Sequence, residues 1–161
     1  MRLQDIRVAG IYFDGKSGVR EVVSLDAHEG TLVYKILAAK VEFEQDHVPG
    51  TMRSCIGGTS RCDAVSLAKW AKEEVLPAQL PALLARLAAR KLRLTPTEKT
   101  FLGNLDVTKL GGVNPLVNGQ LALVRRLVTK GVIERAAQPG GDWALTGVGK
   151  AWLQEQGPSA R

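Results

Sequence analysis

Cysteine and histidine are scarce in this chain of 161 residues, and each occurs only twice. Two cysteines do not build the disulfide framework of a small secreted domain. Cys55 and Cys62 lie seven positions apart. Structural zinc sites usually place paired ligands two to four residues apart and need four of them. We therefore expect two reduced thiols and no metal site.

Long apolar runs are absent as well. None approaches the roughly 20 residues that span a bilayer, and the first residues lack the apolar stretch of a signal peptide. Hydrophobic residues nevertheless make up 45% of the chain and charged residues 24%, which is typical of a folded globular protein. We expect a cytoplasmic protein, of bacterial type, with no membrane association.

Catalytic motifs are missing too. The glycines of Gly57–Ser60 lack the lysine of a phosphate-binding loop, and no Rossmann-type glycine pattern follows a strand. The carboxylates Glu42, Glu44 and Asp46 lie near His47, but in a polar segment where a solvated surface is the expected role. We expect no enzyme and no cofactor.

Positive charge is abundant but unevenly distributed. Residues 1–75 carry 10 Lys and Arg against 11 Asp and Glu, whereas residues 76–161 carry 12 against 5. Lysine and arginine near phosphates release condensed counterions, so the C-terminal half is expected to meet a polyanion. A solvated basic face without a partner would give the same numbers. The acidic balance and few aromatics of the N-terminal half disfavour single-stranded RNA binding there.

The first 60 residues predict short antiparallel strands. Apolar and β-branched runs alternate with turn signals such as Asp14-Gly15. The four predicted strands are Ile6–Phe13, Val19–Leu25, Thr31–Leu37 and Thr51–Ile56. Strands joined in sequence indicate a small antiparallel meander or an SH3-like barrel. A sheet this small needs a helix to cover one face.

We predict that covering helix over Asp63–Val75. Asp63 or Ser60 can cap its start. Its apolar stripe at helical spacing comprises Ala64, Leu67, Ala68, Ala71 and Val75. Trp70 lies beside the stripe and is expected to pack on the sheet. Two prolines follow, and we place a domain boundary near Leu76–Gln79.

A further helix is predicted over Leu80–Leu92. Its apolar stripe comprises Leu80, Leu83, Leu84, Leu87 and Ala88. The stripe is explained either by packing within its own domain or by pairing with a second copy, because dimeric regulators often pair through a helix that flanks the DNA-binding unit.

The segment from Thr95 to Glu98 carries helix-start signals. Thr95 can serve as the N-cap, Pro96 as the first helical residue and Glu98 as the capping-box partner. The predicted buried side of this helix comprises Phe101, Leu102 and Leu105.

A second helix is predicted over Leu116–Lys130, and Gly131 is placed to end it in a left-handed conformation. Its predicted core stripe comprises Val117, Leu121, Val124, Leu127 and Val128. Strands follow at Val132–Arg135 and Trp143–Thr146, and then a last helix that contains Val148, Ala151, Trp152 and Leu153.

The stretches Leu127–Arg135 (LVTKGVIER) and Trp143–Ala151 (WALTGVGKA) resemble the end of a winged helix-turn-helix DNA-binding domain of bacterial regulators. In that family the recognition helix ends at a Lys-Gly pair, and an aliphatic strand follows. The wing then returns through an aromatic-x-Leu-Thr strand into a helix that carries glycine. This sequence departs from the family pattern at two places. The middle helix should lie in Asp106–Gly112, but that segment holds barely one helical turn. The wing tip, Ala136–Asp142, has no Lys or Arg.

The resemblance implies that the helix at Leu116–Lys130 enters the major groove by its N-terminal end. Asn and Gln can pair with adenine, although the same amides form turns. The candidates for base reading are Asn114, Asn118 and Gln120. The candidates for phosphate contacts are Lys109, Arg125, Arg126 and Lys130, and Arg135 completes the DNA-binding set.

The sequence thus predicts an α+β protein with a β-rich domain over residues 1–76, a linking helix over 77–93, a winged helix over 94–156 and a disordered tail over 157–161. The expected partner is double-stranded DNA, bound by a transcriptional regulator. The N-terminal domain would act as sensor, protein-partner site or homodimer module. The alternative is a non-enzymatic protein-interaction module from a plasmid, phage or defence system, since winged helices also bind proteins.

Overall fold

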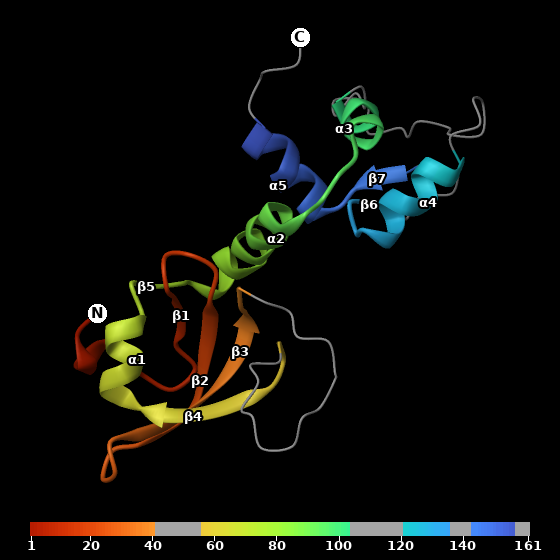
Figure 1. Ribbon diagram of the computed structural model, residues 1–161. Coiled ribbons are helices and arrows are strands. Elements are labelled where there is room, and N and C mark those ends of the chain that lie inside the picture. The colour runs from red at the N-terminus through yellow and green to blue at the C-terminus, as the bar shows by residue number, and fades with distance from the viewer. Residues whose placement is uncertain (41–55, 104–120, 136–142, 157–161) are drawn as a thin grey trace. The chain divides into compact units, whose positions relative to one another are not determined.

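The computed structural model describes residues 1–40, 56–103, 121–135 and 143–156, and the chain divides into two compact units, Met1–Leu80 and Pro81–Arg161. The described residues form five α-helices, a five-stranded antiparallel sheet and a two-stranded sheet, so the expected mixed α+β class is confirmed (Figure 1). None of the helices in these ranges is long and apolar enough to cross a membrane.

The N-terminal unit is organised around the five-stranded sheet. Its strands are β1 (Ile11–Phe13), β2 (Val19–Asp26), β3 (Thr31–Ala38), β4 (Thr59–Asp63) and β5 (Glu73–Glu74), and a short 3-10 turn covers Leu3–Asp5. The order across the sheet is β4-β3-β2-β1-β5, so four strands follow one another in chain order and β5 joins the far side of β1. The β2–β3 ladder changes register between Val19 and Arg20 and again between Val22 and Ser24. Such irregularities bend and twist a strand locally.

Two strand predictions need correction. The strand predicted at Ile6–Phe13 begins only at Ile11, because a turn intervenes in which the Gly10 amide donates to the Arg7 carbonyl. β4 pairs with β3 over residues expected to be a loop and a helix start. The sequence of β4 shows little alternation of apolar and polar residues, because this strand is polar and lies at the edge of the sheet. The strand predicted at Thr51–Ile56 falls outside the described residues, apart from Ile56 in a turn.

One helix, α1 (Ala64–Trp70), packs against this sheet, as predicted (Figure 1). The Asp63 carboxylate caps it by accepting from the Ser66 amide at 2.8 Å. The helix ends at Trp70 and not at Val75, because residues 73–74 pair with β1 instead. The core comprises Ile6, Tyr12, Val22, Leu32, Tyr34, Ile36, Ala64, Leu67, Ala68 and Ala71, with Trp70 packed against it.

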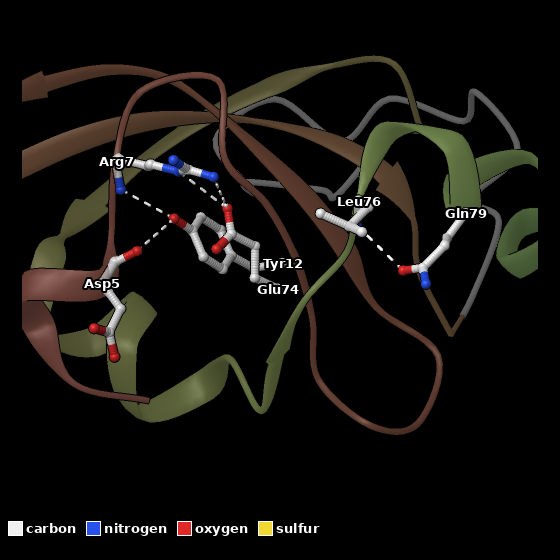
Figure 2. A network of polar contacts seen from close by, with 6 residues as sticks. All are labelled: Asp5, Arg7, Tyr12, Glu74, Leu76 and Gln79. Carbon is white, nitrogen blue, oxygen red and sulfur yellow. Dashed lines mark hydrogen bonds and ion pairs between the residues drawn. The ribbon is translucent and has the colours of Figure 1, made fainter.

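A buried tyrosine fixes the start of the chain to this core (Figure 2). Tyr12 has no exposed surface, and its hydroxyl accepts from the Arg7 amide at 3.0 Å and donates to the Asp5 carbonyl at 2.9 Å. The Arg7 guanidinium also binds the Glu74 carboxylate at 2.8 Å, which ties the N-terminal segment to β5. The residue facing the hydroxyl must be a glycine, since a Cβ on Gly10 would lie 2.3 Å from the Tyr12 oxygen.

Figure 1 shows the succession of helices and strands in the C-terminal part of the chain, after a 3-10 turn at Pro77–Gln79. They are α2 (Leu80–Lys91), α3 (Pro96–Gly103), α4 (Leu121–Thr129), β6 (Ile133–Arg135), β7 (Trp143–Leu145) and α5 (Gly147–Gln156). The core of this unit comprises Ala89, Leu102, Leu123, Val124, Leu127, Val132, Ile133 and Trp152. On α2 the buried residues are Leu83, Leu87 and Ala89, whereas Ala88, predicted in the stripe, is exposed.

Candidate nucleic-acid interface

Helix α4 has one buried face and one exposed face. Leu123, Val124 and Leu127 are buried, whereas Arg125 and Arg126 are exposed. At 100° per residue, Arg125 lies opposite the buried stripe and Arg126 lies toward one side of the exposed face. Helix α4 therefore presents cationic side chains on the side that faces away from the core.

The predicted core stripe of α4 is wrong at two of its positions. Leu121 and Val128 each retain 38% of their surface, and Leu123 is buried in their place. Apolar residues at both 3- and 4-residue spacings occupy more than one face of this helix, so the pattern alone does not determine which face packs inward. The exposed face consequently carries apolar groups beside Arg125, on the flank away from Arg126.

The end of α4 is set by a left-handed glycine. Gly131 has φ of 66°, and its amide donates to the Val128 carbonyl at 2.8 Å while the Val132 amide donates to the Leu127 carbonyl at 2.9 Å. These two bonds form a Schellman motif and confirm the predicted C-cap. The motif turns the chain directly into β6.

The start of α3 is joined to the end of α4 by an ion pair. The Lys130 ammonium donates to both carboxylate oxygens of Glu98, at 2.7 and 2.9 Å, and to the Arg93 carbonyl at 2.8 Å. Glu98 has no exposed surface, and its carboxylate also accepts from the Thr95 amide at 2.7 Å. The predicted capping box is confirmed by this bond and by the Glu98 amide, which donates to the Thr95 hydroxyl.

These contacts determine the charge state of Glu98. Burial opposes its ionisation, but the Lys130 ammonium and the Thr95 backbone and hydroxyl groups outweigh that effect and lower the pKa of the carboxyl below its usual value. The carboxylate is therefore ionised at neutral pH. All three donors of the Lys130 ammonium have protein acceptors, so this lysine is placed to join two helices.

Thr146 and Gly149 position α5 against the two-stranded sheet. The Thr146 hydroxyl accepts from the Gly149 amide at 3.1 Å and donates toward the carbonyls of Gly131 and Val132. It thus caps α5 and connects that helix to the strand after α4. A Cβ on Gly149 would lie 2.3 Å from the Val132 carbonyl oxygen, so helix and strand can approach this closely only at a glycine.

The two-stranded sheet carries one of the predicted DNA contacts. Arg135 pairs with Trp143 across the β6–β7 ladder, and its guanidinium carbon lies 6.0 Å from the centre of a Trp143 ring. Arg135 is exposed and Trp143 is half-buried. At this distance the ring attracts the cation only weakly and leaves it accessible to a ligand.

Cationic groups outnumber acidic ones on the surface of the C-terminal unit. Within the described ranges, Arg90 pairs with Glu155 at 3.0 Å and Lys130 with Glu98. Seven exposed cations have no acidic partner among the described residues, namely Arg86, Arg93, Lys99, Arg125, Arg126, Arg135 and Lys150. The predicted positive character of this half is thus exposed at its surface.

The predicted DNA-binding residues fall into three groups. Arg125, Arg126 and Arg135 are exposed on α4 and β6, and Lys130 is engaged by Glu98. Four others lie outside the described residues, namely Lys109, Asn114, Asn118 and Gln120, as do the middle helix and wing tip expected at residues 106–112 and 136–142. Sequence reasoning identified Glu98 only as a cap. Its bond to a lysine 32 positions away has no local signal.

No protein-family model, curated protein or solved structure matches this chain.

Proposed function

We propose that the C-terminal unit binds double-stranded DNA as a winged helix-turn-helix, with α4 as the helix that enters the major groove. The observation that carries this proposal is the exposed arginine pair on α4, a helix whose opposite face packs into the core. An α-helix fits the major groove, and arginines beside it can contact phosphates.

The order of elements supports the same proposal. A capped helix, α3, precedes α4, and a two-stranded sheet and then α5 follow. This is the order that the resemblance to winged-helix regulators implies. In its more specific form, we propose that the protein is a cytoplasmic bacterial transcriptional regulator. In it, Arg125, Arg126 and Arg135 contact phosphates, and Lys109, Asn114, Asn118 and Gln120 belong to the same DNA-binding set.

The placement of Lys130 refines this assignment. Because its ammonium already has three acceptors, we infer that Lys130 contributes to DNA binding by holding α4 against α3 rather than by touching phosphate. The phosphate contacts then fall to the arginines, whose guanidinium groups also match phosphate geometry better than an ammonium does.

The direct test is the double variant Arg125→Ala with Arg126→Ala, measured by fluorescence polarisation on random duplex DNA. We expect the intact chain to bind at low salt and the double variant to bind at least about tenfold more weakly on every sequence, because phosphate contacts carry no sequence information. The matched control is Arg86→Ala with Lys150→Ala, which removes the same charge from α2 and α5. Equal loss in both pairs would contradict a specific role for α4.

A second candidate function is docking of α4 on a protein. It is favoured by one observation, the exposure of Leu121 and Val128 beside Arg125 on one flank of α4. Exposed apolar groups mark protein-binding surfaces when they lie together. The double variant Leu121→Ser with Val128→Ser separates the two functions, because loss of a protein partner with unchanged DNA affinity would favour docking.

A further inference from the structure

The N-terminal unit holds a pocket that the proposed DNA contacts do not use. Its volume is about 140 Å³, and its walls include Asp14, Gly18, Arg20, Lys40 and Trp70. This volume is close to that of cavities known to hold a molecule the size of benzene. The pocket is therefore large enough for a small ligand or for the end group of a larger one.

Arg20 is held in an unusual position at this pocket. Its guanidinium carbon lies 4.0 Å from the centre of a Trp70 ring and 4.4 Å from that of Tyr34, so an aromatic ring from α1 and one from β3 both contact it. Stacking of this kind orients the plane of a guanidinium. The N–H groups at its edge remain available for hydrogen bonds.

No described residue accepts a hydrogen bond from those N–H groups. The other described arginines of this unit have carboxylate partners, as Arg7 has Glu74 and Arg61 has Glu29. Arg20 is half-exposed and lines the pocket, and no described carboxylate forms an ion pair with it, although Asp14 interacts with it electrostatically. An oriented guanidinium with free donors is the group proteins use to bind a carboxylate or phosphate by two parallel bonds.

The remaining walls select among anions. Asp14 contributes one negative charge, and its Oδ1 accepts from the amides of Lys16, Ser17 and Gly18 at 2.8–2.9 Å. Lys40 contributes one exposed positive charge at the pocket. Among the described lining residues, Arg20 and Lys40 against Asp14 leave a net single positive charge, which matches a monoanionic carboxylate better than a doubly charged phosphate.

Gly18 keeps this arrangement open. A Cβ at that position would lie 2.8 Å from Trp70 Cζ2 and 3.0 Å from Asp14 Oδ2. Any side chain there would displace the ring that orients Arg20. The glycine is therefore consistent with a wall shaped around the guanidinium.

We propose that this pocket binds the carboxylate of a small organic acid or of a peptide C-terminus, with Arg20 as the anchoring residue and Lys40 as a supporting charge. With a small organic acid as ligand the N-terminal unit would be a sensor. With a peptide C-terminus as ligand it would be a docking site for the C-terminal end of another protein. The inference is independent of DNA binding, because every residue it uses lies in the N-terminal unit.

The test is an NMR titration of the full-length protein with sodium propionate, followed at the indole N–H of Trp70. We expect a saturable shift with a dissociation constant on the order of 1 mM, a strength suited to a ligand of so few atoms. Propionamide has the same shape without the charge and should give no saturable shift. N-acetyl-Ala-Ala with a free carboxylate, compared with its amide, extends the test to peptide ends. Tighter binding than propionate identifies a peptide source, and equal or weaker binding a free acid.

Two variants assign the site. Arg20→Lys keeps the charge but loses the planar fork, and should weaken propionate binding by roughly tenfold. Lys40→Gln changes an exposed residue, so the fold is retained, and should weaken binding by about threefold. Arg61→Lys on β4 is the control and should bind as the parent does. Absence of a saturable shift up to about 100 mM propionate, a concentration roughly a hundredfold above the expected dissociation constant, would overturn the proposal. Equal shifts with propionamide, or unchanged binding in both variants, would overturn it as well.

Discussion

The role of Lys130 in the structure differs from the role that the sequence predicts. At the end of a basic helix it was expected to contact phosphate, yet its ammonium donates to Glu98 and to the Arg93 carbonyl. Glu98 was recognisable in the sequence as a capping residue because Thr95 and Glu98 have the capping-box spacing. Its pairing with Lys130 was not predictable, because the two residues meet only after α3 and α4 have packed.

We predict that Lys130→Met destabilises the C-terminal unit by roughly 3 kcal/mol, because it leaves the buried Glu98 carboxylate without its counterion. Lys99→Met removes an exposed lysine from α3 and should cost less than about 0.5 kcal/mol. Urea unfolding can be followed at the indole N–H signals of Trp143 and Trp152 for this unit and of Trp70 for the other. Equal stability of the two variants would contradict the structural role of Lys130.

The lowered pKa of Glu98 predicts a pH dependence with a definite sign. Because the folded state holds this carboxyl below its ordinary value of 4.5, ionised Glu98 stabilises the fold at neutral pH. That contribution is complete above the ordinary value and is lost as pH falls from there through the lowered pKa. The free energy of unfolding of Glu98→Gln should therefore fall less steeply between about pH 5 and pH 3 than that of the parent. Parallel pH profiles would refute this assignment.

At the scale of helices and strands, the sequence identified what local patterns encode. The capping box of α3, the Asp63 cap of α1 and the glycine end of α4 were all predictable, because each depends on residues within a few positions. β4 was missed because an edge strand made of polar residues shows no alternation of apolar and polar residues in the sequence. The β5 pairing was missed because two glutamates carry no strand signal.

The exposed arginines of the candidate site were predictable from their charge, but the face of α4 was not. Leu121, Leu123 and Val128 offered competing stripes, and only packing into the core that also contains Val132 and Trp152 decides that Leu123 is buried. The sequence therefore predicted a basic helix without showing that Leu121 and Val128 remain accessible beside Arg125.

The junction between α5 and β6 gives a prediction at the same scale. Gly149→Ala would place a Cβ 2.3 Å from the Val132 carbonyl oxygen, so helix and strand must separate, at a cost of about 2 kcal/mol or more. Gly147→Ala is the matched control, since its Cβ would meet only Ala85 at an ordinary 3.5 Å. Thermal unfolding of the two variants distinguishes them, and an unchanged midpoint for Gly149→Ala would show that the close approach is wrong.

For the whole molecule, the separation into two units and the uneven charge predict that only the C-terminal unit binds DNA. A fragment of residues 77–161 should fold and retain DNA binding, whereas a fragment of residues 1–80 should fold without binding DNA, because the basic excess lies in the C-terminal half. Circular dichroism tests folding and polarisation tests binding. DNA binding that resides in the N-terminal fragment would reverse the assignment.

The central claim, DNA binding through α4, is tested most directly by the salt dependence of affinity for random duplex DNA. Each phosphate neutralised contributes about −0.9 to the slope of log affinity against log salt. We predict a steep negative slope for the intact chain, shallower by roughly 2 in the variant that lacks Arg125 and Arg126, and unchanged in the variant that lacks Arg86 and Lys150. No binding at about 50 mM salt, or the same slope without the two α4 arginines, would contradict the account.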